Sequence, residues 1–137
     1  MKIYITIALA MFVMNTANAQ EAPIKAVFDV TSANTEVHQS AVRHVNLMSE
    51  AYPDSSFELV IYSSAYEMVD NKSSTVSEAM HEILKKENVS IVVCALTLKK
   101  NEKDMKDLIP GVGIVPDGIY EIISKQMQGW GYIKEGK

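Results

Sequence analysis

The sequence predicts an α/β fold, a three-layer α/β/α sandwich on a mostly parallel sheet of four to five strands. Short β-branched apolar segments alternate with longer segments whose apolar residues recur every three or four positions. These segments follow one another as strand and helix four times over, which is the order of right-handed βαβ units. The strongest strand candidate, residues 89–95, is apolar on both faces, as a central parallel strand between helical layers must be.

The first part of the chain contains one complete strand–helix–strand unit. Residues 24–30 form the first predicted strand, and the polar turn 31–35 supplies an N-cap for the helix that follows. The apolar residues of this helix recur at spacings of four, four, three and four, and Pro53 ends it. They are Val37, Ala41, Val45, Met48 and Tyr52. Residues 57–62 form the second predicted strand.

Two capping-box spacings follow the second strand. The first, from Ser64 to Glu67, predicts a short helical turn, and the second, from Thr75 to Glu78, predicts the start of a helix. The apolar stripe of this helix consists of Val76, Met80, Ile83 and Leu84. Asn88 is the expected left-handed residue that ends it, directly before the strand 89–95.

The last part of the chain is less regular. Residues 97–108 are polar and charged, which predicts a loop with a short helix, and residues 113–116 form a brief fourth strand. Asp117 is the expected cap of the last helix. The apolar positions of this helix are Ile119, Ile122, Ile123, Met127 and Trp130. The tail 131–134 adds a short edge strand.

Composition and the N-terminus indicate where the protein works. The chain has 13 Lys and Arg against 17 Asp and Glu, and this acidic balance argues against binding to nucleic acid or to an anionic membrane. Residues 1–19 read as a bacterial export signal, because a short basic start, an apolar run and the small residues Ala17 and Ala19 precede Gln20. We therefore expect a single domain over residues 20–137, periplasmic or secreted, with no membrane span after cleavage.

The lone cysteine, Cys94, lies one residue from the end of the predicted central strand, at the edge of the sheet where α/β folds bind ligands. A reactive thiol and a small buried core residue are both compatible with this position. Three further residues are expected at the same edge and are pocket candidates. They are Asp29 at the end of the first strand, His38 in the first turn of the first helix, and Thr97.

Other common sites have no sequence support. His44 and His81 lack the spacing of metal ligands, so we expect no metal site and no cofactor. No glycine-rich loop follows a strand, which argues against a nucleotide site of the Rossmann type. A single cysteine excludes an intrachain disulfide and a paired-cysteine redox motif.

Two segments resemble the DsrE/DsrF-like family. The stronger match is C-terminal and reads DLIPGVGIVP at residues 107–116, GIYEII at 118–123 and QGWGYIK at 128–134, as in exported members. The weaker match is IVVCALTL at residues 91–98, where the family often has Cys-Gly-Asn-Thr and this chain has Cys-Ala-Leu-Thr. The departure removes a glycine and a polar amide from the vicinity of the thiol.

The resemblance carries expectations beyond the fold. It implies a three-layer α/β/α fold and a homo-trimer or homo-hexamer. It also implies that Cys94 accepts sulfur as a persulfide and exchanges it with a donor or acceptor protein. The alternative is a non-catalytic oligomeric binding or scaffold module in which the cysteine is structural.

Overall fold

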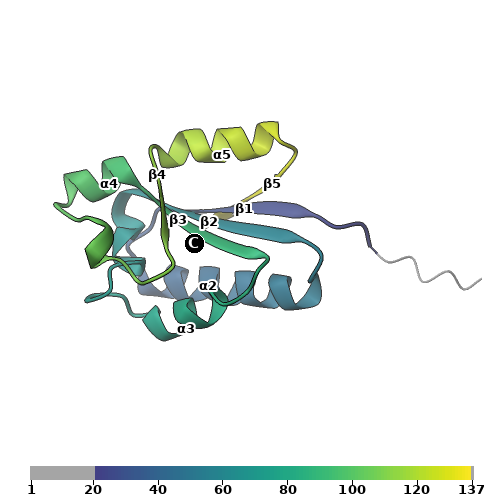
Figure 1. The fold of residues 1–137 in the computed structure, drawn as a ribbon, viewed down its shortest axis with the longest axis horizontal. Coiled ribbons are helices and arrows are strands. Elements are labelled where there is room, and N and C mark those ends of the chain that lie inside the picture. Colours follow the sequence, from purple (N-terminus) through teal and green to yellow (C-terminus); the bar gives the residue numbers. More distant parts are fainter. Residues whose placement is uncertain (1–20, 137) are drawn as a thin grey trace, which may run out of the picture.

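Five strands form one sheet in the computed structural model, which describes residues 21–136 (Figure 1). The strands are β1 (Lys25–Val30), β2 (Ser56–Ile61), β3 (Val89–Cys94), β4 (Gly113–Val115) and β5 (Gly131–Glu135). Their order across the sheet is β4-β3-β2-β1-β5, and every neighbouring pair is parallel. The predicted parallel α/β sheet is confirmed. The export signal predicted at 1–19 lies outside the described residues.

Helices cover both faces of this sheet. Helix α2 (Thr35–Ala51) and helix α3 (Ser77–Ile83) lie on one face, and α5 (Gly118–Met127) lies on the other (Figure 1). Helix α4 (Ala95–Lys100) and the 3₁₀ turns η1 (Ser63–Met68) and η2 (Met105–Asp107) complete the connections. Because β5 pairs with β1, helix α5 carries the chain from one edge of the sheet to the other.

The two faces of the sheet differ in character. The face under α2 and α3 holds the large apolar core, which includes Phe28, Phe57 and Leu59. On the face under α5 the apolar cluster is small, with Val27, Val60 and Ile122 at its centre. Alternation along each strand explains the split, since successive side chains point to opposite faces. The face under α5 therefore has room for polar groups.

Capping side chains fix where two of the helices, α2 and α5, begin. Asn34 accepts a hydrogen bond from the Glu36 amide at 2.9 Å, and Asp117 accepts one from the Ile119 amide at 2.9 Å. Both predicted caps are confirmed. The capping box predicted for the third helix is wrong, because the residue before Ser77 is Val76, which makes no side-chain cap.

Asn88 does not have the left-handed backbone expected of it. The non-glycine residues with positive φ among residues 21–136 are Ser63 and Glu102. Instead, the Asn88 side-chain amide donates to the main-chain oxygen of Ser49 at 3.2 Å, which links the start of β3 to the end of α2. A tertiary contact thus uses the asparagine that the local pattern assigned to a helix end.

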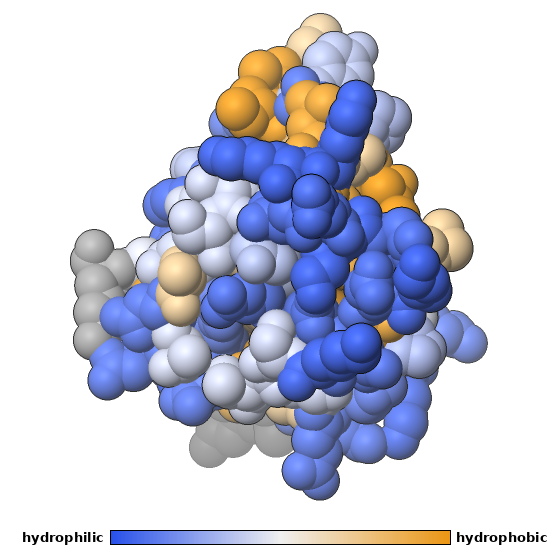
Figure 2. Space-filling view, turned by 90° about the vertical axis from the view of Figure 1, so that its left-hand side faces the viewer, coloured by the Kyte–Doolittle hydropathy of each residue, from blue (hydrophilic) through white to orange (hydrophobic). Residues whose placement is uncertain are grey.

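Helix α5 turns most of its predicted apolar positions outward. Ile122 is buried, whereas Ile119, Ile123 and Met127 are exposed, Met127 to 84%. Hydrophobic surface gathers toward the top of the molecule, where α5 lies, and the rest of the visible face is mostly hydrophilic (Figure 2). Within residues 21–136, no helix has both the length and the apolar character that a membrane span requires.

Candidate functional site

Cys94 is the last residue of β3, at the carboxyl edge of the sheet. Its backbone is extended, with φ −70° and ψ 124°, and it occupies the position directly before the first turn of α4. The predicted strand ran one residue further, but Ala95 already belongs to α4. The residue is 5% exposed, so the thiol is nearly covered in the monomer.

The start of α5 packs against Cys94. A Cβ atom placed on Gly118 would lie 3.2 Å from the Cβ of Cys94 and 3.2 Å from Cδ1 of Tyr62. Both distances are shorter than ordinary van der Waals contacts, so a larger residue at position 118 requires Cys94 or Tyr62 to shift by a few tenths of an ångström. Cys94, Tyr62 and the first turn of α5 therefore form one tightly packed group.

A pocket of about 390 Å³ opens beside this group. Its lining consists of Tyr62, Ser63, Cys94, Leu96, Thr97, Lys100, Asp117 and Ile119. A second hollow of about 270 Å³ shares Ser63, Thr97 and Lys100 with it. The combined space is of the size that small ligands occupy. Within residues 21–136, Lys100 is the one cationic side chain that lines both hollows.

Thr97 holds one wall of the pocket in place. Its hydroxyl oxygen accepts a hydrogen bond from the Ser63 amide at 3.0 Å, and this bond joins α4 to the turn after β2. Ser63 has a φ of 56°, a conformation that non-glycine residues adopt at a cost and that recurs at binding sites. The structure thus brings Thr97 and Cys94 to the same pocket.

Asp29 lies on the same face of the sheet as Cys94 but does not line the pocket, because β2 separates the two. The Tyr132 hydroxyl donates to its Oδ2 at 2.6 Å, and the Lys134 Nζ lies 3.1 Å from its Oδ1. The Tyr62 hydroxyl lies near enough to this carboxyl group for the carboxylate to raise the tyrosine pKa. Asp29 is therefore held by Tyr132 and Lys134 and has Tyr62 beside it.

The two tyrosines at Asp29 are strongly perturbed. Burial first, and then the charge of Asp29 and the hydrogen bond to it, raise the pKa of Tyr62 to about 12. For Tyr132 the hydrogen bond to Asp29 comes first, followed by burial, and its pKa also rises to about 12. Both hydroxyl groups stay protonated at neutral pH and act as donors.

His38 is not part of this site. It is buried on α2, under the opposite face of the sheet from Cys94, and its Nε2 lies 2.7 Å from the main-chain oxygen of Ser32. The expected shared edge is real, but the helix places the ring against the core instead of in the pocket. The Nδ1 of His44 lies 2.8 Å from Glu135 Oε1. Among the described residues, no three potential ligands gather to hold a metal ion.

A buried polar cluster under α5 was not predicted from the sequence. Glu58 on β2 accepts hydrogen bonds from the Ser90 hydroxyl at 2.6 Å and from the Lys125 Nζ at 2.9 Å. The same ammonium group lies 4.3 Å from the centre of the Trp130 ring. The sequence carries one signal for this cluster: Glu58 and Ser90 are each a polar residue near the start of a predicted apolar strand. The structure pairs these two residues across β2 and β3.

Comparisons with known proteins identify the fold. No family model matches the chain, and no curated protein matches it. Solved structures do. The protein of unknown function MTH1491 from Methanobacterium thermoautotrophicum is 24% identical, with a TM-score of 0.76 over 81% of this chain and 98% of that one. The ychN protein from E. coli is 15% identical, with a TM-score of 0.64 over 83% of this chain and 99% of that one.

A third solved structure is similar over a comparable length. The conserved protein of unknown function BT1422 from Bacteroides thetaiotaomicron is 15% identical, with a TM-score of 0.58 over 85% of this chain and 99% of that one. At these identities the likeness is one of fold, namely a parallel sheet between helical layers.

Proposed function

We propose that this chain, which has a DsrE-like fold, carries sulfur as a persulfide on Cys94. The observation that supports the proposal most directly is the position of the cysteine. It ends the interior strand β3, which lies between β2 and β4, precedes the first turn of α4, and forms part of the wall of the 390 Å³ pocket. Ligand sites in open α/β sheets occupy this edge.

The proposed transfer is a thiol exchange. The Cys94 thiolate attacks the outer sulfur of a donor persulfide, R–S–SH. A bond forms between Sγ and the outer sulfur, and the sulfur–sulfur bond of the donor breaks. The donor leaves as the thiolate R–S⁻ with the electron pair of that bond, and the proton stays on the outer sulfur. The step consumes no oxidant and no reductant, and delivery to an acceptor is the same exchange in reverse.

The pocket offers a route to the thiol. Lys100 is an exposed cation on its rim and favours the approach of an anionic donor. Leu96, which is 61% exposed, stands where the family often has a polar residue, so one side of the opening is apolar. We expect a persulfide carried by a peptide or protein to suit this opening better than a small inorganic polysulfide.

The burial of Cys94 supports a second candidate function. A cysteine that is 5% exposed and packs against Gly118 is also typical of a structural residue in a protein core. In that case the chain is a non-catalytic binding or scaffold module, and the pocket binds its ligand without covalent chemistry. The two candidates differ in the reactivity of one atom and can therefore be separated by experiment.

Labelling the native protein separates them. A sulfur carrier reacts with iodoacetamide in the native state, and after incubation with a low-molecular-weight persulfide its intact mass rises by about 32 Da, one sulfur atom. Cys94→Ser abolishes the mass increase and leaves the fold stable. A structural cysteine reacts only after unfolding, and Cys94→Ser then costs about 1–3 kcal/mol of stability. Slow native labelling together with that loss would falsify the carrier proposal.

We also propose that the protein is a homo-oligomer, a trimer or hexamer by resemblance. Leu96 on α4 and Ile119, Tyr120, Ile123 and Met127 on α5 are all exposed large apolar residues, each between 49% and 84%. Contiguous apolar surface of this kind is typical of protein–protein contacts. Sedimentation at micromolar concentration that shows only a monomer contradicts this proposal.

We propose further that the protein is exported from a bacterial cell and begins at Gln20 after signal cleavage. The support is the sequence pattern of residues 1–19 alone. N-terminal sequencing of the protein from the periplasm or the medium tests it. Recovery of chains that begin at Met1 from the membrane fraction contradicts it.

A further inference from the structure

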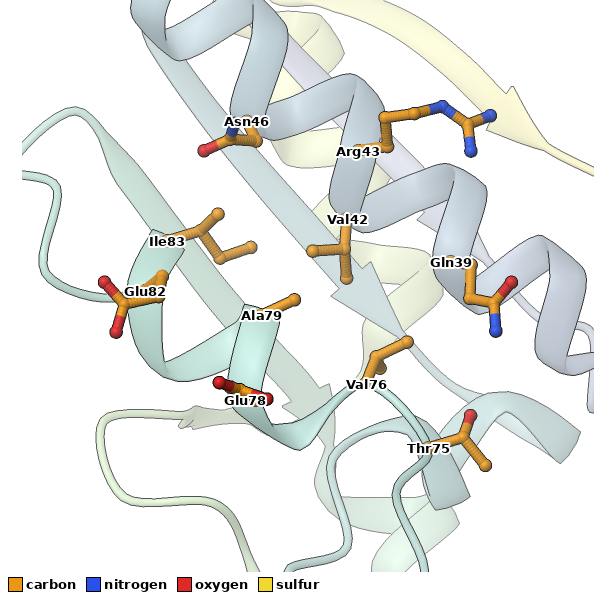
Figure 3. A pocket seen from close by; sticks show the side chains of 10 residues that line it. All are labelled: Gln39, Val42, Arg43, Asn46, Thr75, Val76, Glu78, Ala79, Glu82 and Ile83. Atoms are coloured by element: carbon orange, nitrogen blue, oxygen red, sulfur yellow. The ribbon is translucent and has the colours of Figure 1, made fainter.

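We propose that the groove between α2 and α3 binds an amphipathic helix of a partner protein. This helix carries basic side chains on one flank of its apolar stripe and acidic side chains on the other. The groove has a volume of about 570 Å³ (Figure 3). It lies on the face of the sheet opposite Cys94, so the inference does not depend on the proposed function.

The residues along the groove recur at the spacing that lets a third helix pack between α2 and α3. On α2 they are Gln39, Val42 and Asn46, and on the α3 side they are Val76, Ala79 and Ile83. Both rows step by three and then four positions, which is the spacing at which helices pack side by side in bundles and coiled coils. Each row spans eight residues, or about 10 Å of helix, so about two turns of a partner fit.

Opposite charges flank the two rows. Arg43 stands beside the row on α2, and Glu78 and Glu82 stand beside the row on α3. In Figure 3 the valine, alanine and isoleucine side chains point between the helices, while Arg43 and Glu82 extend outward from the two sides. Flanking charges of this kind select partner and orientation in helix pairing.

The charges on both sides are available to a partner. Arg43 donates to the Ser40 hydroxyl at 3.1 Å, and within residues 21–136 neither Arg43 nor Glu78 is in an ion pair. Glu82 pairs with Lys85 at 2.7 Å, but both side chains are more than 60% exposed, and such pairs are weak. The occupant that fits has its basic flank over α3 and its acidic flank over α2.

The exposed helix of this chain does not meet these requirements. The apolar stripe of α5 has Glu121 and Lys125 nearby, but Lys125 is turned inward to Glu58 and lies 3.5 Å from Glu121. A second copy therefore offers the stripe without the two flanks. Because Val42, Val76 and Ile83 are nearly buried already, the groove adds little apolar area, and the charges decide which helix binds.

Three fluorescent helical peptides with one common leucine–alanine stripe test the proposal. The first has lysine on one flank and glutamate on the other, the second has lysine on both, and the third has glutamate on both. Reversing a peptide in the groove exchanges its flanks, so the mixed peptide fits in one direction and the other two fit in neither. Fluorescence anisotropy with the purified full-length protein is expected to give at least about tenfold tighter binding for the mixed peptide.

Charge-reversed variants make the test independent of any one peptide. Arg43→Glu makes both sides acidic and is expected to shift the preference to the lysine peptide. Glu78→Lys with Glu82→Lys makes both sides basic and is expected to shift it to the glutamate peptide. Lys99→Glu on α4, outside the groove, is the matched control and leaves the order unchanged.

Three outcomes overturn the inference. The peptides bind equally or not at all, the order does not follow the groove variants, or the groove variants dissociate an oligomer in sedimentation. The last outcome assigns the groove to a second copy of the chain. None of these results bears on the reactivity of Cys94, so failure here and failure of the sulfur-carrier proposal remain distinguishable.

Discussion

Removal of the Lys125 ammonium group tests the buried cluster under α5. The side chain of Glu58 is only 6% exposed, and Lys125 Nζ, at 2.9 Å from Oε2, is the one cation paired with it among residues 21–136. The Ser90 hydroxyl occupies the same oxygen, and Glu58 Oε1 has no hydrogen-bond partner within the described chain. Lys125→Met keeps the length and the apolar stem of the side chain but leaves the carboxylate unpaired.

The expected loss of stability is about 3 kcal/mol. Loss of one partner of a buried ion pair costs roughly 3–5 kcal/mol, because a charge stays in the interior without compensation. We expect the lower end, since Lys125 is itself 17% exposed and water can reach part of the site. Glu58→Gln together with Lys125→Met removes both charges. It is expected to lie within about 1 kcal/mol of the wild type, so the coupling, once the cost of Glu58→Gln alone is also subtracted, is at least about 2 kcal/mol.

Urea unfolding followed by circular dichroism measures both values, with equal slopes as the condition for comparing midpoints. Lys85→Met is the matched control, because its pair with Glu82 is exposed on both sides and is expected to contribute less than about 0.5 kcal/mol. If Lys125→Met is as stable as the control, or if the effects of the two single variants simply add, Glu58 is not a buried charge that depends on Lys125.

Tyr62, Tyr132, Gly118 and Asp70 each make a close contact whose effect on stability can be measured. The raised pKa of Tyr62 and of Tyr132, about 12 each, means that the folded state holds these protons more tightly than the unfolded state does. The stability that these two tyrosines contribute is therefore fully present below pH 10 and is lost as the pH rises through 12. In a titration followed by tyrosinate absorbance, two groups should ionise late, and each Tyr→Phe variant should remove one of them. Gly118→Ala, whose new Cβ would lie 3.2 Å from two neighbours, should cost about 1–2 kcal/mol in urea unfolding, whereas Gly131→Ala, at 3.6 Å from its nearest contact, should show no such crowding penalty. Burial raises the pKa of Asp70, but its hydrogen bonds and its ion pair with Lys103 outweigh burial, so the pKa is lowered. The stability that Asp70 supplies is therefore present above pH 3.8 and is lost below it. Asp70→Asn should flatten the acid side of a plot of melting temperature against pH.

The sequence was sufficient for the elements of the fold because local chemistry decides them. Runs of β-branched residues such as 89–94 have few alternatives to a buried strand, and Asn34 and Asp117 cap helices through atoms only two or three residues away. The same local logic failed at Asn88, where a hydrogen bond to Ser49, 39 positions away, determines the role of the side chain. Patterns of spacing carry no information about such distant partners.

The sequence predicts where the candidate site lies, but it does not predict which residues line it. The end of an interior parallel strand identifies Cys94, and the start of the following helix brings Thr97 with it, since both are consequences of one strand–helix turn. His38 was expected at the same edge because its helix begins there. The edge is shared, but α2 and Cys94 lie on opposite faces, and the order of residues along the chain does not specify a face.

The placement of β5 connects the remaining features of the site. Had β5 continued the sheet beyond β4, Tyr132 and Lys134 would lie far from Asp29, and α5 would not cross β1 and β2. Pairing with β1 instead puts both side chains on the carboxyl group of Asp29 and carries α5 over the polar face. There its first residue, Gly118, packs against Cys94. The packing at Cys94, the tyrosine–aspartate group and the buried Glu58 are therefore consequences of a single long-range strand pairing, which no local pattern in the sequence encodes.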